Sequence, residues 1–148
     1  MKTNKAGIEL IKHFEGCKLQ AYLCPANVWT IGYGTTRYED GRKVKQGDEI
    51  QLGYAELLLK EDLIAFEEKV KALVKSDINE NQFSALVSFT YNLGARNLSI
   101  STLLKKVNKN PNDPTIDLEF KKWINANGKP LNGLIKRREA ESKLYFKK

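Results

Sequence analysis

A long amphipathic pattern in the middle of the chain constrains the fold more than any other feature of the sequence. Between Tyr54 and Lys75, apolar residues recur at helical spacing and the opposite positions are rich in Glu and Lys. The apolar stripe consists of Ala55, Leu58, Leu59, Leu63, Phe66, Val70, Leu73 and Val74. The length of this pattern predicts a helix that connects two lobes of one fold.

The segment before this helix has a pattern typical of β-structure. Residues 28–36 are rich in β-branched and aromatic side chains. The dipeptide Asp40-Gly41 is typical of a hairpin turn, and residues 43–45 are a candidate return strand. We therefore expect a small sheet that ends by Gly53.

A first helix is predicted to precede this sheet. Within residues 3–15, Ile8, Ile11 and Phe14 recur at helical spacing. Gly16 is suited to close the helix, because glycine readily adopts the left-handed conformation that ends many helices. Glu15 is then the last helical residue.

The rest of the chain reads as helical. Residues 79–94 are apolar on nearly all sides, which predicts a buried helix with Asn79 as N-cap, Gln82 three positions on and Gly94 as the stop. Further helices are expected over residues 101–108, from Asp113-Pro114 toward Trp123, and over residues 134–146. The prediction is an α+β fold in one domain, with a small β-containing lobe at residues 15–55 and a larger all-α lobe formed by residues 1–14 and 56–148.

Charge and composition limit the classes of partner. The chain has 148 residues, 41% of them hydrophobic, and a formal net charge of +7. This charge favours an anionic partner such as nucleic acid, anionic lipid or a bacterial wall polymer, although a solvated basic surface explains it equally well. The Lys and Arg residues are spread along the chain and not interleaved with aromatics, which argues against a nucleic-acid-binding protein. The sequence also has neither an 18-residue apolar run nor a signal-peptide pattern, so we expect a cytoplasmic origin without stable membrane insertion.

Cysteine and histidine usage excludes several kinds of site. Cys17 and Cys24 are too few for a disulfide framework and are expected to be free thiols. His13 is the only histidine, so no zinc-ligand spacing occurs and neither a metal nor another cofactor is expected. A Ser-His or Cys-His catalytic pair would have to use His13.

Glu15 is the candidate acid. It is the only carboxylate between His13 and Thr36, a stretch that contains both cysteines, three glycines and several aromatics. The C-terminal end of a helix disfavours a negative charge and so favours the protonated carboxyl that a general acid needs. The alternative is an ordinary solvated glutamate at a fraying helix end.

Glu15, Cys24 and Thr30 together fit the pattern E-x8-[D/C]-x5-T. With the segments AYLCPANVWTIGYGTT, SALVSFTYNLG, STLLKKVN and GLIKRREAE, they give the chain a resemblance to the phage-type lysozymes, the endolysins of glycoside hydrolase family 24. The resemblance extends over residues 1–148 and implies one lysozyme domain with the two-lobed lysozyme fold. It implies hydrolysis of the β-1,4 bond between N-acetylmuramic acid and N-acetylglucosamine in bacterial peptidoglycan.

The resemblance also assigns roles to individual residues. It makes Glu15 the general acid and makes Thr30 and Cys24 the holders of the attacking water, with Cys24 where many members carry Asp. Trp29 and Tyr33 alternate with Thr30 on the expected strand and are candidates to bind sugar. One face of this strand is expected to stack on sugar and the other to lie in the core, and the alternation does not distinguish the two. A lytic transglycosylase, which needs only one acid, is the nearest alternative, but the water-positioning threonine favours hydrolysis. A wall-binding module without activity is a further alternative.

Thr35 and the pair Arg137 and Arg138 can also be compared with the family pattern. Many members read GYGHT where this chain has Thr35 in place of the histidine, and we expect this change to affect stability or pH response more than chemistry. Arg137 and Arg138 resemble the family's paired arginines, although a solvated basic turn is an equal alternative. The resemblance further implies a monomer that stays in the host cytoplasm until a separate membrane pore, a holin, releases it to the periplasm and cell wall.

Overall fold

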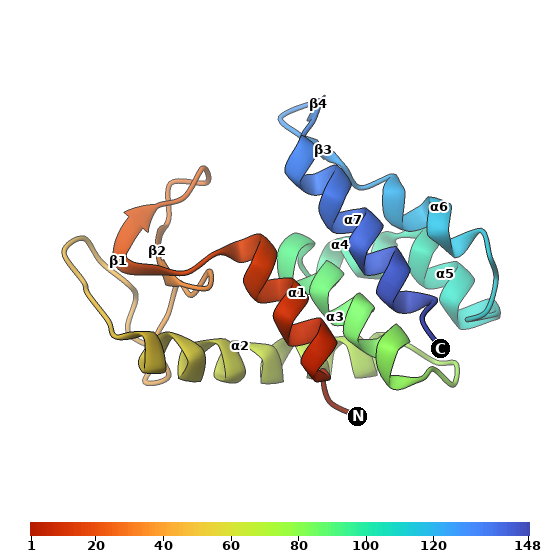
Figure 1. The fold of residues 1–148 in the computed structure, drawn as a ribbon, viewed down its shortest axis with the longest axis horizontal. Coiled ribbons are helices and arrows are strands. Elements are labelled where there is room, and N and C mark those ends of the chain that lie inside the picture. The colour runs from red at the N-terminus through yellow and green to blue at the C-terminus, as the bar shows by residue number, and fades with distance from the viewer. The chain divides into compact units, whose positions relative to one another are not determined.

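The computed structural model describes residues 1–148, which form two compact units (Figure 1). The helical unit consists of Met1–Phe14 and Phe66–Lys148, and the sheet unit consists of Glu15–Ala65. Helix α2, Leu52–Leu73, has residues in both units. No helix combines the length and the apolar character needed to cross a membrane.

The helical unit contains most of the secondary structure. Its elements besides the second part of α2 are α1 (Lys5–Glu15, of which Glu15 belongs to the sheet unit), α3 (Glu80–Leu93), α4 (Ala95–Ile100), α5 (Thr102–Lys109), α6 (Ile116–Lys121), β3 (Asn125–Ala126), β4 (Lys129–Pro130) and α7 (Asn132–Tyr145). Helix α3 packs mainly against α7, and α7 also packs against α6 (Figure 1). The short β3–β4 hairpin lies between the helix predicted to run toward Trp123 and the one predicted over residues 134–146.

Helix α3 is buried and is defined by local sequence signals. The side chain of Asn79 accepts a 2.8 Å hydrogen bond from the Gln82 amide, and the Gln82 side chain accepts a 2.9 Å bond from the Asn79 amide. This reciprocal pair is a capping box, which satisfies amides that the first turn of a helix leaves without partners. The helix ends at Gly94, whose amide donates to the Thr90 carbonyl. The predicted N-cap and stop of this helix are both confirmed.

Aromatic side chains link the helices of the helical unit. The ring of Phe89 on α3 lies edge-on to those of Phe120 and Trp123, at centroid distances of 5.9 Å and 5.7 Å. Phe120 in turn contacts Tyr145 on α7 at 5.6 Å. Edge-to-face aromatic pairs add about 0.5–1.5 kcal/mol each beyond the burial of their surface. They tie α6 and α7 to the buried α3.

The sheet unit is built on an antiparallel pair of strands, β1 (Lys18–Leu23) and β2 (Trp29–Gly32). The register pairs Tyr22 with Thr30 and Leu23 with Trp29, and it shifts between Lys18 and Tyr22. Such a shift bends the strand and changes the direction of its side chains. The sequence predicted β2 as part of residues 28–36 but did not predict β1.

The loop between β2 and α2 is less regular than predicted. The expected return strand at residues 43–45 is wrong, because Lys43 forms only an isolated bridge with Arg37. Backbone bonds from Tyr38 to Arg42 and from Val44 to Thr36 flank this bridge, so the segment forms a short hairpin turn without a regular strand. The Tyr38 hydroxyl donates a 2.7 Å hydrogen bond to Asp48 and ties this turn to the segment before α2.

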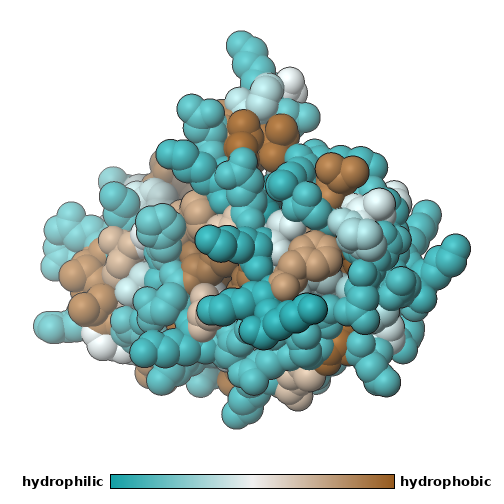
Figure 2. Space-filling view, turned by 45° about the vertical axis from the view of Figure 1, so that its right-hand side comes forward, coloured by the Kyte–Doolittle hydropathy of each residue, from teal (hydrophilic) through white to brown (hydrophobic).

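The core of the sheet unit is small. Buried Ile31, Tyr38 and Val44 pack together with Leu58 of α2. Partly buried Ala21, Trp29, Ile50 and Tyr54 pack against these four. Outside the cores, the face shown in Figure 2 is covered mainly by hydrophilic residues, with apolar side chains in small groups.

Candidate active site

Glu15 lies where α1 ends and the sheet unit begins. The Asn4 side chain caps the start of α1 by accepting a 2.9 Å hydrogen bond from the Gly7 amide. At the other end Gly16 has φ = 68°, a left-handed conformation that allows the chain to leave the helix after Glu15. The prediction that Glu15 is the last helical residue is confirmed. Its side chain is half-buried, so the carboxyl is neither enclosed nor fully solvated.

Cys24 begins the turn that joins β1 to β2. Its amide bonds to the Val28 carbonyl at 3.0 Å, and its carbonyl accepts from the Asn27 amide at 2.8 Å. Asn27 has φ = 65°, a conformation that asparagine tolerates better than most residues. The turn therefore wraps its own backbone around the Cys24 side chain.

This turn favours a negative charge on Cys24. The pKa of the thiol is lowered, mainly because the Val28 backbone amide faces the sulfur, and the Ala26 amide and the Thr30 hydroxyl act in the same direction. Partial burial of the thiol opposes them. The thiolate is the reactive and charged form of cysteine, and backbone amides stabilise it as they would a carboxylate.

Thr30 is buried on β2, with 4% of its surface exposed. Its hydroxyl donates a 3.0 Å hydrogen bond to the Val28 carbonyl, and it also contributes to the lowered pKa of Cys24. A hydroxyl has one proton, so the Thr30 hydroxyl donates to the Val28 carbonyl in one orientation and to a Cys24 thiolate in another. Thr30 and Cys24, which the sequence paired only through a motif, are therefore neighbours in the structure.

Tyr22 is a residue of this site that sequence reasoning missed. It is half-buried on β1, and burial raises the pKa of its phenol, with Glu15 and then Cys24 adding to the effect. The Glu15 carboxyl and the Cys24 thiol therefore both lie within electrostatic range of the Tyr22 side chain. Tyr22 stands opposite Thr30 in the sheet register, and partners of this kind share a face of the sheet. No local signal in the sequence pointed to Tyr22, because its place opposite Thr30 depends on the register of β1 against β2.

The two aromatics predicted to bind sugar lie deeper in the sheet unit. Trp29 is half-buried and packs against the Ile31 cluster. Tyr33 is 7% exposed and donates a 3.4 Å hydrogen bond to Glu56 of α2. Burial raises the pKa of Tyr33 to about 12, and Cys17 and Glu56 contribute. Sugar binding by Trp29 and Tyr33 stays a prediction.

The cysteines and the paired arginines have distinct environments. Cys17 and Cys24 are both free thiols.

Arg137 and Arg138 of α7 are buried within the helical unit, so the alternative of a solvated basic turn is wrong. Each has its Nε close to Glu141, at 3.2 Å and 3.3 Å respectively. Glu141 lies three and four positions further along α7, so the helix brings its carboxylate beside both guanidinium groups, and this opposite charge favours their burial.

An α+β fold with an acid at the end of its first helix, followed by a hairpin that carries Cys24 and Thr30, defines a lysozyme-like protein. The model of the phage lysozyme family matches residues 12–141. The endolysin of Acyrthosiphon pisum secondary endosymbiont phage 1 is 40% identical over 149 residues, covering 98% of both chains. The endolysin of Bacillus phage B103 is 42% identical, covering 99% of this chain but only 54% of its own length.

Solved structures give the same result. The endolysin from Escherichia coli O157:H7 phage FAHEc1 has a TM-score of 0.88 and 37% identity, covering 99% of this chain and 94% of that one. The chain therefore belongs to the phage lysozyme family. The resemblance seen in the sequence and the predicted α+β, lysozyme-like fold are both confirmed.

Proposed function

We propose that this chain is an endolysin that cleaves peptidoglycan by hydrolysing the β-1,4 bond between N-acetylmuramic acid and N-acetylglucosamine. The observation that carries the proposal is the meeting of Cys24, Thr30 and Tyr22 on one hairpin, with Glu15 in electrostatic range of Tyr22. Membership of the phage lysozyme family and relatives named endolysin support the class of substrate.

In the proposed mechanism Glu15 is the general acid. It donates its proton to the glycosidic oxygen as the bond to the leaving sugar breaks. Positive charge then develops on the sugar in an oxocarbenium-like transition state. Water held by Cys24 and Thr30 attacks the face opposite the leaving group and passes its surplus proton to the Cys24 thiolate, so the anomeric configuration is inverted.

The chemistry proposed for Cys24 follows from its turn. Most glycosidases use a second carboxylate to activate water or stabilise charge. The amides of Val28 and Ala26 favour an anion at the Cys24 sulfur, as they would favour an Asp carboxylate at the same position. A thiolate there supplies negative charge near the sugar, and the Thr30 hydroxyl orients the water.

We further propose a route of action for the whole protein. It works as a monomer, waits in the host cytoplasm and reaches the periplasm and cell wall when a separate membrane pore, a holin, opens. Its formal net charge of +7 favours attraction to the anionic wall and is not used for nucleic acid.

Digestion of purified peptidoglycan, followed by mass analysis of the released ends, tests the proposed reaction. A hydrolase leaves a reducing sugar end, whereas a lytic transglycosylase leaves a 1,6-anhydro end that is lighter by one water. Glu15→Gln serves as the matched inactive control, because it keeps the size of the side chain and removes the acidic proton. Anhydro ends would replace the hydrolase by a transglycosylase, and no cleavage by the folded protein would leave only a wall-binding module.

A further inference from the structure

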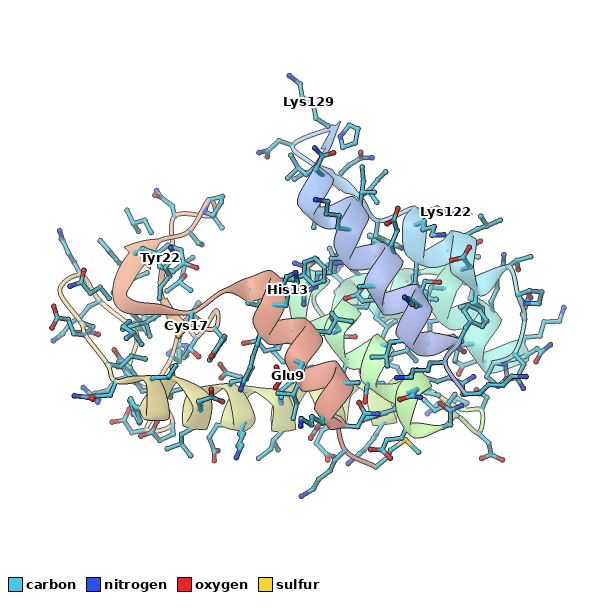
Figure 3. The ribbon with its side chains drawn as sticks, viewed as in Figure 1. Glu9, His13, Cys17, Tyr22, Lys122 and Lys129 are labelled. Atoms are coloured by element: carbon cyan, nitrogen blue, oxygen red, sulfur yellow. The ribbon has the colours of Figure 1, made fainter.

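Strand β1 brings an aromatic side chain to the proposed site that the Glu15, Cys24 and Thr30 motif does not contain. Tyr22 is the register partner of Thr30, so the two side chains lie on the same face of the sheet. The register shift between Lys18 and Tyr22 bends the strand just before this position. Figure 3 labels Tyr22 near the hairpin end of β1 and Cys17 near its start.

Tyr22 is also positioned relative to the charged groups of the site. Burial raises the pKa of its phenol, and Glu15 and then Cys24 act electrostatically in the same direction, so the hydroxyl keeps its proton at neutral pH. A protonated phenol is a hydrogen-bond donor. Tyr22 therefore offers a neutral donor close to two groups that can carry negative charge.

The surroundings of Tyr22 leave room for a ligand. An open groove of about 680 Å³ runs along β1 and is lined by residues from Cys17 to Tyr22. The Tyr22 side chain is half-buried, whereas Tyr33 is 7% exposed and its hydroxyl is held by Glu56. Of these two tyrosines, Tyr22 is the one with both ring surface and hydroxyl available to a ligand.

We propose that Tyr22 contacts the substrate directly, with its ring against the apolar face of a sugar and its hydroxyl donating a hydrogen bond to an oxygen of that sugar. An aromatic ring with a polar tip suits a sugar, which presents an apolar C–H face and a hydroxyl rim. This inference rests on the proposed glycan-cleaving function and adds a substrate-contacting residue to it.

The test separates binding from cleavage by using Glu15→Gln as a background that does not turn over. A GlcNAc–MurNAc tetrasaccharide is titrated by calorimetry into Glu15→Gln and into the same protein carrying Tyr22→Phe or Tyr22→Ala. Loss of the hydroxyl should weaken binding roughly 3- to 10-fold, the size of one ordinary hydrogen bond. Loss of the whole ring should weaken it further, to about 10- to 100-fold in total.

A matched control distinguishes loss of a sugar contact from a general effect on the structure of the sheet unit. Tyr54→Phe removes a hydroxyl of the same unit that bonds to Glu39, and it should leave tetrasaccharide binding unchanged. Thermal unfolding should show equal midpoints for Tyr22→Phe and its parent, so that Tyr22→Phe keeps the test valid if Tyr22→Ala is unstable.

The outcomes distinguish this inference from the proposed function. If the parent cleaves peptidoglycan while Tyr22→Phe and Tyr22→Ala bind tetrasaccharide as tightly as Glu15→Gln alone, Tyr22 is not a contact and the function stands. If folded Glu15→Gln binds no tetrasaccharide, the Tyr22 contact is overturned whatever the cleavage assay shows. If the parent does not cleave but Glu15→Gln binds and the Tyr22 variants bind more weakly, the contact holds and the hydrolase proposal fails.

Discussion

The hydroxyl of Thr35 donates a 2.7 Å hydrogen bond to Oδ2 of Asp62. This bond joins the segment after β2 to α2 inside the sheet unit, and Thr35 is 1% exposed. Burial raises the pKa of Asp62, the Thr35 hydrogen bond opposes that rise, and Glu61 adds to it. A neutral threonine cannot neutralise a buried carboxylate as a protonated histidine would. Ionisation of Asp62 therefore lowers the free energy of unfolding.

Stability should therefore depend on the protonation of Asp62. The pKa of Asp62 is higher in the folded than in the unfolded state, so protonation of Asp62 adds to the free energy of unfolding at low pH. This contribution is complete below the ordinary pKa of 3.8 and is lost as the pH rises through the raised pKa of the folded state. Asp62→Asn keeps an acceptor for Thr35 and removes the charge. We expect a higher thermal midpoint than the parent at pH 7 and a weaker response between pH 7 and pH 4.

Thr35→Val is the matched partner of this experiment. It keeps the shape of the side chain but removes the donor, so Asp62 loses its hydrogen bond while still charged. The expected cost at pH 7 is about 1–3 kcal/mol in the free energy of unfolding, measured in urea. An Asp62→Asn protein less stable than its parent at pH 7 would contradict the proposed charge penalty.

The buried charges of the helical unit give a second prediction. Glu141 is fully buried, accepts a 2.5 Å hydrogen bond from Ser88 and faces Arg137 and Arg138. Removing one member of a buried ion pair leaves uncompensated charge and costs about 3–5 kcal/mol. Glu141→Leu should lose stability on this scale in urea unfolding. Asp40→Asn, which breaks an exposed pair with Arg42, should leave the free energy of unfolding almost unchanged, because solvent and salt screen such a pair. Equal losses in the two variants would refute the distinction.

Local signals predicted the parts of this fold that depend on neighbours in sequence. The capping box of Asn79 and Gln82 lies within a single helical turn, so the sequence contains the whole interaction. The position of Glu15 likewise follows from a helix and the glycine after it. Such features need no knowledge of distant residues.

Non-local pairing explains what the sequence did not predict. Residues 18–23 lack a marked strand composition and become β1 because β2 lies beside them. Tyr22 joined the site only when the register set it opposite Thr30. The burial of Arg137 depends in part on Ser88, which is far from it in the chain and accepts from its guanidinium. None of these contacts has a periodicity that a sequence pattern could reveal.

Glu15 gives the most direct prediction for activity. Glu15→Gln should lower the rate of peptidoglycan cleavage by on the order of 10² to 10⁴, the usual contribution of general acid catalysis. The assay is release of soluble fragments from purified peptidoglycan at equal protein concentration, with circular dichroism to show that the variant is folded. Cleavage near the parent rate would remove Glu15 from the mechanism.

The net charge of +7 leads to a prediction about salt. Attraction to an anionic wall is screened over about 8 Å at physiological ionic strength and fades further as salt rises. Lysis of whole cells should therefore fall more steeply between low and high salt than cleavage of a short neutral oligosaccharide. The same salt response for both substrates would mean that wall attraction contributes nothing.

Cys24 is the position where this chain departs from a two-carboxylate glycosidase, and four measurements define its role. Cys24→Asp should retain activity, because the Val28 and Ala26 amides can hold a carboxylate in the same turn. Cys24→Ala should lose much of the activity and keep the fold. Cys17→Ala is the control and should change little. Alkylation of thiols should inactivate the parent and spare Cys24→Asp.

The lowered pKa of Cys24 adds a dependence on pH that separates charge from packing. The Val28 amide favours the thiolate, so Cys24 should react with an alkylating agent at a lower pH than a thiol with the ordinary value of 9.0. If the thiolate is the active form, the cleaving species has Cys24 ionised while Glu15 still carries the proton it donates, so cleavage by the parent should show a bell-shaped dependence on pH. Cys24→Asp should reach its maximum at a lower pH, because a carboxylate forms at a lower pH than a thiolate. Full activity in Cys24→Ala would reduce the cysteine to a packing residue, whereas a covalent sugar adduct on its sulfur would replace the water-holding role by a retaining mechanism.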